Sequence, residues 1–351
     1  MINVSEPKVS VCIPVFNGEN YLHDCIQSVL EQNYGNFELL IMDNCSTDST
    51  QLIVSKIQDN RIRYVRNDKN IGVYNNFSKC IAEAFGEYFI LLPHDDLLLP
   101  GCLSNYVEKF EDKSIGLVYS SVKIVNAEGR LLDTRVSHKK NLKFNSEEAI
   151  EDVFKNFMPI QLAMVRTSIL RGVGAFDSYY AVFSDIQLWL KVFFADWDCF
   201  FLTKPYSCHR SHEAQGQVAF AELKLDVLND HWAKKLDKEF WKNNSYNIFC
   251  LRLMQFAERE LIKKSIINNN VSNLMLDIFI RSHLRFLVRS AARLNGFILW
   301  QEILLFRSVK KSYGLLNILN RYPFILLSEI QRKVGKEIKL LVKYFFGFRS
   351  R

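Results

Sequence analysis

The sequence predicts an α/β fold, with a mostly parallel central sheet flanked by helices and followed by a C-terminal α-helical extension. Two observations predict the sheet. Short apolar segments typical of buried strands alternate with amphipathic helical patterns, and polar residues follow directly after several of these strands. The extension is predicted by a change to basic helical periodicity near residue 226. We therefore divide the chain into residues 1–225 and 226–351.

The predicted elements are spaced as in a parallel sheet with right-handed crossovers. Strands are expected at residues 9–15, 37–42, 62–65, 87–92 and 116–125. The first of these is apolar almost throughout, as a strand buried on both faces should be. Helical patterns are expected at residues 21–30, 52–57 and 73–84. Ser46 or Thr47 is the expected cap of the second helix.

The charge of the chain is divided unevenly between its two parts. Of 45 Lys and Arg and 38 Asp and Glu, residues 231–351 hold 23 basic and 8 acidic side chains, a net charge of +15. The remainder is acidic, with a net charge of −8. Such an asymmetry indicates that the basic part meets a polyanion, either a membrane or a nucleic acid.

The eight cysteines and the N-terminus indicate the compartment. No two cysteines form a CxxC pair and several lie in apolar runs, so we expect reduced core residues. The N-terminal residues lead directly into a strand without a signal-peptide pattern. No apolar run approaches the ~18 residues of a transmembrane helix. These features predict a protein of a reducing compartment.

Three carboxylates follow predicted strands, at the edge where an open α/β sheet binds its ligand. They are Asp43, Asp95 and Asp96. Adjacent carboxylates at a strand end suit a hard divalent cation, and a cation there suits a phosphorylated substrate. The first strand is followed by PVFNGEN instead of a GxGxxG turn, and a P-loop is absent. A dinucleotide-binding Rossmann domain is therefore excluded.

Six segments in order resemble the family 2 glycosyltransferases, over roughly residues 8–215. They are VSVCIPVFN, DNCSTDST, Asn70-Ile71-Gly72, LLPHDDLLLP, SDIQLWLKV and HRSH. The resemblance implies a Rossmann-like GT-A fold and an inverting, metal-dependent transfer of a hexose-type sugar. The implied donor is a nucleotide-sugar, most simply a UDP-sugar. Asn44, Pro93 and Ser184 stand where the family has acidic residues.

The resemblance implies a set of donor-binding residues. They are Pro14, Phe16, Asn17, Asp43, Asn70 and Asp95. Asp43 would accept a hydrogen bond from the nucleobase, most simply from uracil N3–H; the alternative role is a helix cap or turn. Phe16 would stack on the base or pack in the core.

The resemblance also implies a Mn²⁺ or Mg²⁺ ion bound by Asp96 and His212, a mixed oxygen and nitrogen ligand set. Asp95 would then contact the ribose or hydrogen-bond to a ligand of the metal. The reverse assignment of the two aspartates is also allowed. His94 is a further candidate ligand. Arg210 would reach the diphosphate or pair with a site carboxylate.

Asp185 is the implied catalytic base, which removes the proton of the acceptor hydroxyl. It begins a helical pattern containing Leu188, Trp189 and Val192, and its alternative role is to stabilise a helix N-terminus. Asp177 is the second candidate base. Residues 157–164 are expected to line the acceptor side.

The predicted function is therefore sugar transfer to a saccharide or lipid-linked saccharide, in surface polysaccharide or glycan biosynthesis. The alternative is a degenerate GT-A module that binds nucleotide-sugar or a protein partner without turnover. Basic amphipathic patterns around residues 280–293 and 333–351 predict a peripheral protein at the cytoplasmic face of an anionic membrane. A homo-oligomer contact is the alternative use of these helices, and no nucleic-acid partner is expected.

Overall fold

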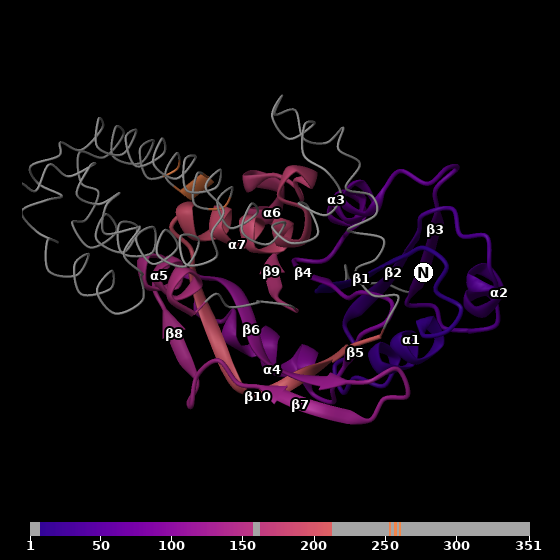
Figure 1. Cartoon of the computed structure of the whole chain (residues 1–351), viewed down its shortest axis with the longest axis horizontal. Coiled ribbons are helices and arrows are strands. Elements are labelled where there is room, and N and C mark those ends of the chain that lie inside the picture. The colour runs from indigo at the N-terminus through magenta and orange to yellow at the C-terminus, as the bar shows by residue number, and fades with distance from the viewer. Residues whose placement is uncertain (1–7, 157–161, 213–252, 254–255, 258–259, 261–351) are drawn as a thin grey trace, which may run out of the picture. The chain divides into compact units, whose positions relative to one another are not determined.

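The computed structural model describes residues 8–156, 162–212, 253, 256, 257 and 260 (Figure 1). The chain divides into two compact units, Met1–Leu236 and Asp237–Arg351. All elements named below lie in the first unit. The predicted boundary at residue 225 and almost all of the predicted basic region, residues 226–351, lie outside the described residues. The membrane and oligomer predictions for that region therefore remain predictions.

The described part contains ten strands, seven α-helices and one 3-10 helix. The strands are β1 (Val9–Val15), β2 (Phe37–Asp43), β3 (Ile62–Arg66), β4 (Tyr88–Leu91), β5 (Leu97–Leu98), β6 (Ile115–Val125), β7 (Leu131–Arg135), β8 (Leu142–Phe144), β9 (Met164–Arg166) and β10 (Asp198–Arg210). The helices are α1 (Leu22–Leu30), α2 (Thr50–Ser55), α3 (Val73–Glu83), α4 (Cys102–Lys109), α5 (Ser146–Asn156), α6 (Thr167–Val173), α7 (Ser184–Phe194) and the 3-10 helix η1 (Ser178–Phe183).

The described strands form one mixed sheet in the order β3-β2-β1-β4-β9-β6-β10-β5, with β7 added to β6 and β8 added to β10. Strands β3, β2, β1 and β4 are parallel, which confirms the sheet predicted for the N-terminal half. The short strand β9 lies antiparallel between β4 and β6. Strand β10 runs parallel to β6 and carries the chain back to the edge where β4 ends.

Helices cover both faces of the sheet (Figure 1). On one face, Val9, Val11 and Ile13 of β1 pack in a core that includes Leu22 of α1 and Leu103 of α4. On the other face, the thiol of Cys12 is directed to the backbone carbonyl of Cys80 in α3. All seven residues of β1 and of β2 are buried, as expected for strands covered on both sides.

Two predictions about local structure are changed by the fold. Helix α2 begins at Thr50 without a side-chain cap, so neither Ser46 nor Thr47 caps it. The hydroxyl of Ser46 donates to Asp43 instead. Of the residues expected to line the acceptor side, 157–161 lie outside the described part, and Leu162, Ala163 and Met164 are buried. Within the described residues, we find no helix with the length and apolar character of a membrane span.

Candidate functional site

The loops after β1 and β2 are joined by hydrogen bonds that fix the edge of the sheet where these two strands end. The side-chain oxygen of Asn17 accepts a hydrogen bond from the backbone N–H of Thr47 at 2.8 Å. The backbone N–H of Asn17 donates to the hydroxyl of Ser46 at 2.9 Å. The backbone N–H of Gly18 donates to the hydroxyl of Thr50 at 2.9 Å. Asn17 adopts the left-handed conformation that this turn requires, with φ of 54°.

Of the residues predicted near the donor on β1, Pro14 is buried in the strand opposite Met42, whereas Phe16 is 37% exposed. An exposed ring directly after the strand has a free face for stacking on a planar ligand. Phe16 therefore remains available for the predicted contact with the base, and Pro14 contributes to the wall of the strand end.

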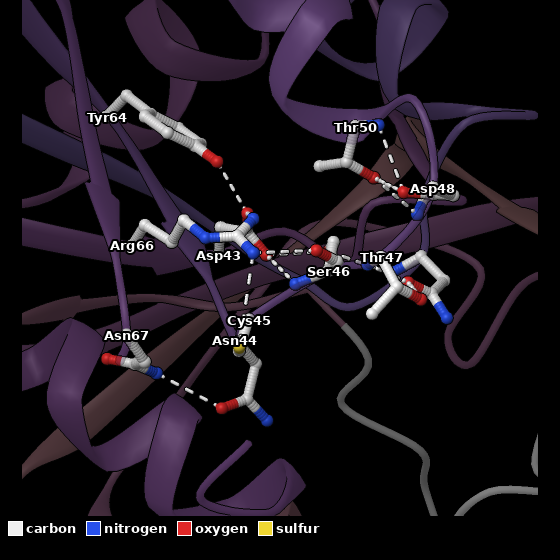
Figure 2. A network of polar contacts seen from close by, with 12 residues as sticks. Asp43, Asn44, Cys45, Ser46, Thr47, Asp48, Thr50, Tyr64, Arg66 and Asn67 are labelled. Atoms are coloured by element: carbon white, nitrogen blue, oxygen red, sulfur yellow. Dashed lines mark hydrogen bonds and ion pairs between the residues drawn. The ribbon is translucent and has the colours of Figure 1, made fainter. Parts of the chain in front are cut away.

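Asp43, at the end of β2, is fully buried and is bound by its neighbours (Figure 2). One carboxylate oxygen accepts hydrogen bonds from the Ser46 backbone N–H at 2.8 Å and from the Ser46 hydroxyl at 2.6 Å. The other accepts from the hydroxyl of Tyr64 and from the Arg66 guanidinium, the latter at 2.8 Å. Because a carboxylate has about four acceptor positions, Asp43 is saturated in this arrangement. Burial and the bond to Asp43 raise the pKa of Tyr64 to about 12.

Asn44, the neighbour of Asp43, centres a network of amide side chains. Its side-chain oxygen accepts hydrogen bonds from the Asn67 amide at 3.1 Å and from the Ile71 backbone N–H at 2.9 Å. Its amide nitrogen donates to the side-chain oxygen of Asn70 at 2.9 Å. Asn70 also accepts from the backbone N–H of Gly72, whose φ of 84° favours glycine. This network fixes the exposed loop that carries Asn70 beside the strand end.

The side chains of Asp95, in the turn after β4, and His212, just after β10, contact each other. The His212 Nε2 lies 3.0 Å from a carboxylate oxygen of Asp95, and the side chains are 14% and 12% exposed for His212 and Asp95 respectively. Arg210 joins two loops near this pair. Its guanidinium donates to the backbone carbonyl of Asp95 at 3.0 Å and to that of Ala127 at 2.7 Å. The guanidinium also lies over the ring of Tyr21, 4.6 Å from its centroid. Neither role predicted for Arg210 includes these carbonyl contacts.

Asp96 is turned toward strand β10. Its carboxylate accepts a hydrogen bond from the backbone N–H of Arg210 at 2.9 Å and lies 3.2 Å from the Nδ1 atom of His209. Burial raises the pKa of Asp96. Burial opposes the charged form of His209, but the hydrogen bond to Asp96 prevails and raises the pKa of that imidazole. The structure thus pairs His212 with Asp95 and His209 with Asp96, so Asp96 and His212, the two residues assigned to the metal from the sequence, have different partners.

The two other candidates near this edge are fixed by packing. A Cβ atom on Gly18 would lie 2.9 Å from the ring of His94, so this histidine lies tightly against the loop after β1. The carbonyl of Pro93 is contacted by the thiol of Cys25 on α1. His94 and Pro93 therefore support the loop that presents Asp95.

Asp185 lies in the first turn of α7 and is partly exposed. Burial raises the pKa of its carboxyl to about 6, although a hydrogen bond from the Ile186 backbone N–H at 2.7 Å acts in the opposite direction. The buried residues Leu188 and Trp189 anchor the helix. Asp177 accepts from the Tyr179 backbone N–H at 2.9 Å, at the start of η1. Asp177 is thus used in a turn, whereas Asp185 has the raised pKa that suits a base.

Several residues of the site are not identified by the sequence alone. Tyr64 and Arg66 contact Asp43, Tyr21 contacts Arg210 and lies near His212, and His209 contacts Asp96. The alternation in Tyr64-Val65-Arg66 is the available signal, because residues two apart on a strand share a face. For Tyr21, the sequence indicates only membership of a helical stripe.

Asp95 and His212 are the described side chains that fit a divalent cation. Two adjacent ligands of one octahedral ion lie about 3 Å apart when each metal–ligand distance is about 2.1 Å. The observed separation of 3.0 Å agrees with this value and is equally that of the direct hydrogen bond between the two side chains. No cluster of three or more His, Cys, Asp and Glu side chains suited to a metal occurs among residues 8–156 and 162–212. A divalent ion at this pair would therefore have two ligands among the described residues, Asp95 and His212.

Comparisons with known proteins identify the family and the fold of the matched part of the chain. Residues 10–173 match the family described as "Glycosyl transferase family 2". An uncharacterised glycosyltransferase of Rickettsia prowazekii is 27% identical over 68% of this chain and 75% of its own length. The GalNAc(5)-diNAcBac-PP-undecaprenol beta-1,3-glucosyltransferase of Campylobacter jejuni is 27% identical over 53% of this chain and 60% of its own length. Across these two and six further curated relatives, the matched part spans between 27% and 75% of their length.

Among solved structures, residues 1–349 of S. aureus TarS in complex with UDP-GlcNAc superpose with a TM-score of 0.53. The sequences are 17% identical, and the match covers 87% of this chain and 91% of that one. This likeness concerns the fold, and it confirms the predicted GT-A class for the α/β part. Residues 10–173, which contain the first four of the six motifs in order apart from Val9 at the start of the first, therefore form a glycosyl transferase family 2 domain.

Proposed function

We propose that this protein transfers a sugar from a nucleotide-sugar, most simply a UDP-sugar, to a saccharide or lipid-linked saccharide with inversion at the anomeric carbon. The observation that carries the proposal is the Asp95–His212 pair at the end of β4, on the edge that also presents Asp43. An open α/β sheet binds its ligand at this edge. TarS, which has the same fold, was solved with UDP-GlcNAc.

The nucleobase is proposed to bind beside Asp43, with Phe16 and the Asn70 loop as neighbours. Asp43 can accept a hydrogen bond from uracil N3–H only if one of its present partners leaves. Arg66 is the partner suited to leave, because its side chain is 35% exposed and its other guanidinium nitrogen retains the carbonyl of Ser46 at 2.8 Å. Arg66 would then lie against the base instead of the carboxylate.

A Mn²⁺ or Mg²⁺ ion is proposed to be held by Asp95 and His212. When bound, such an ion neutralises charge on the leaving diphosphate. Asp96, placed at the metal in the sequence-based assignment, is proposed instead to hold β10 through His209 and the Arg210 backbone. This keeps His212 opposite Asp95.

Asp185 is proposed to accept the proton of the acceptor hydroxyl as that oxygen attacks the anomeric carbon. A carboxylate with a pKa near 6 is mostly ionised at neutral pH and is a stronger base than an ordinary aspartate. Its position in the first turn of α7 fixes the side chain on a rigid element. The mechanism needs no covalent enzyme intermediate, so no nucleophilic side chain is assigned.

The acceptor is proposed to be a saccharide on a lipid carrier, in surface polysaccharide assembly at the cytoplasmic face of a membrane. The Campylobacter relative is named for an acceptor on undecaprenol diphosphate, and a Bacillus subtilis relative is named a putative glycosyltransferase of teichuronic acid biosynthesis. The basic region after residue 226 is proposed to bind the anionic surface.

Donor turnover tests the proposal directly. The purified protein is incubated with UDP-, GDP- and dTDP-sugars, with Mn²⁺ or with chelator, and the released nucleoside diphosphate is measured. Metal-dependent hydrolysis of one donor that is lost in Asp185→Asn and Asp95→Ala is the expected result. Absence of turnover together with absence of nucleotide binding by calorimetry would refute the proposal. Nucleotide binding that persists without turnover, even with an acceptor-containing membrane extract, would favour the degenerate binding module.

A further inference from the structure

The hairpin arm, residues 130–140, carries a concentration of exposed apolar side chains. Leu131, Leu132 and Val136 are 54%, 59% and 50% exposed. The other exposed large apolar side chains of the described part, Phe16, Leu52 and Phe85, lie far from these positions in the sequence. A cluster of exposed apolar residues indicates an interaction surface, whereas isolated ones need no explanation.

Both faces of strand β7 in this arm are open. All five residues of β7 are exposed, and its described partner is β6 alone, through pairs from Val122↔Arg135 to Val125↔Leu131. The register shifts between the pairs Ile124↔Asp133 and Val125↔Leu131, so Leu132 is the extra residue of a β-bulge at the start of β7. Strand β7 lies at the lower margin of Figure 1, and its two leucines are both exposed.

Basic side chains surround these apolar groups. Arg130, Arg135, Lys139 and Lys140 are all exposed, and Asp133 is the acidic residue within the arm. An arm with an excess of three positive charges favours an anionic partner. An anionic surface strengthens binding about fivefold for each basic residue close to it, and exposed leucines require an apolar phase beside the charge. A soluble polyanion satisfies the first requirement and leaves the leucines in water.

The arm is tied to the candidate site. The turn that leads into it contains Ala127, whose carbonyl accepts the hydrogen bond from Arg210 at 2.7 Å, and the same guanidinium binds the carbonyl of Asp95. Strand β6 separates Arg135 from the β10 segment that ends at Arg210. A surface bound by the arm would therefore lie close to the Asp95–His212 pair.

We propose that the hairpin arm docks on an anionic lipid surface, with Leu131, Leu132 and Val136 in the interface and the four basic residues at the headgroups. The docking is separate from any attachment through the basic region after residue 226. It also gives the proposed enzyme direct access to an acceptor anchored in that surface, a consequence that rests on the proposed function.

Vesicle binding of the full chain tests the docking without donor or turnover. Phosphatidylcholine vesicles with and without phosphatidylglycerol are used in a flotation assay, at low and at high salt. The double variant Leu131→Ser, Leu132→Ser is expected to lower partition to the anionic vesicles about tenfold or more. Leu52→Ser, which changes a leucine of similar exposure on α2, is the matched control and should retain binding.

A second measurement locates the contact. Leu132→Trp is expected to show an additional fluorescence signal that brominated lipid quenches, whereas Leu52→Trp is expected to show none. Undiminished partition of the serine variant, together with an additional signal in Leu132→Trp that brominated lipid leaves unquenched, would overturn the proposal, since the binding would then lie elsewhere on the chain. A serine variant that changes the oligomeric state without vesicles would overturn it in favour of a second copy as the partner. Because neither readout needs sugar transfer, an inactive enzyme leaves this test intact.

Discussion

The side-chain amide of Asn44 donates a hydrogen bond to the side-chain oxygen of Asn70 at 2.9 Å, and that same oxygen accepts the backbone N–H of Gly72 at 2.8 Å. Asn70 cannot be flipped without losing the contact with Gly72. Asn44 must therefore be the donor, and an aspartate has no proton to donate here at neutral pH. This explains why an amide occupies a position where the related family has an acid.

Restoring the acid of the family should therefore harm this protein. Asn44→Asp places a carboxylate oxygen against the side-chain oxygen of Asn70, and we expect a loss of about 1–3 kcal/mol in the free energy of unfolding. Binding of nucleoside diphosphate should weaken with it, because the Asn70 loop is released. Thermal unfolding and calorimetry measure both effects. Asn33→Asp is the control, because the exposed Asn33 only accepts a hydrogen bond, from Ser104. Equal stability of Asn44→Asp and wild type would contradict the network.

Variants of the two adjacent aspartates should behave differently. Asp95→Ala is expected to abolish metal-stimulated donor hydrolysis and to lower the melting temperature less than Asp96→Ala does, because the Asp95 side chain is 12% exposed whereas that of Asp96 is 3% exposed. Asp96→Ala leaves the buried backbone N–H of Arg210 without its partner and is expected to cost about 1–3 kcal/mol of stability. Metal titrations and thermal unfolding of both variants separate the roles. If Asp96→Ala were stable and unable to respond to metal, the sequence-based assignment of Asp96 to the ion would stand.

The raised pKa of Asp185 links activity and stability to pH. Below about pH 6 the carboxyl is protonated and cannot accept a proton, so donor transfer should fall as the pH drops through this value. The stability effect has the opposite sense. The protonated carboxyl of Asp185 is favoured in the folded protein, because its pKa there is above that in the unfolded chain. This contribution to stability is fully present below the unfolded pKa and is lost as the pH rises through about 6.

Asp185→Asn should therefore be inactive and, above pH 6, more stable than the wild type by about 1–3 kcal/mol. At pH 4 the two proteins should unfold at nearly the same temperature. Asp177→Asn retains an acceptor for Tyr179 and is the control, with activity and its pH profile unchanged. A gain in stability that is independent of pH would show that burial of the charge is not its origin.

Replacement of Arg66 tests the recognition of the base. Arg66→Leu leaves the buried Asp43 carboxylate with a free acceptor position and one cation fewer. We expect a lower melting temperature without ligand and a larger stabilisation by UDP than in the wild type, with no such gain for GDP. Arg61→Leu, which removes the ion pair with Asp59 at the other end of β3, serves as the control. An equal response to UDP and GDP would argue against uracil recognition by Asp43.

The sequence predicted the parallel half of the sheet well because β1 and β2 are buried on both faces, which produces unbroken apolar runs. Strand β10 was not predicted. It contains Pro205 and a register shift between Leu202 and Ser207, so it lacks a simple period. Strand β7 was not predicted either, since its leucines are exposed and no buried face produces alternation.

The site was predicted as a set of residues, and its pairings were not. Asp95 and Asp96 lie in the turn between β4 and β5, so the period of a strand does not determine where they point. Which one meets His212 depends on how β10 ends beside β5 and this turn, a contact between residues more than a hundred positions apart. The sequence also did not predict that all acceptor positions of Asp43 are occupied, because two of its partners, Tyr64 and Arg66, come from the neighbouring strand β3.

The cysteines of the described part differ in exposure, which allows one of them to be labelled selectively. Cys12, Cys25, Cys80, Cys102, Cys199 and Cys208 are buried, and burial raises the pKa of Cys12, Cys25 and Cys102. Cys45 is partly exposed, with its sulfur 3.9 Å from the guanidinium of Arg66. A thiol-reactive fluorophore would therefore find a natural attachment point beside Arg66 and Asp43, the residues proposed to recognise the base. Arrival and departure of a nucleotide would be read there as a change in emission, without any engineered label site.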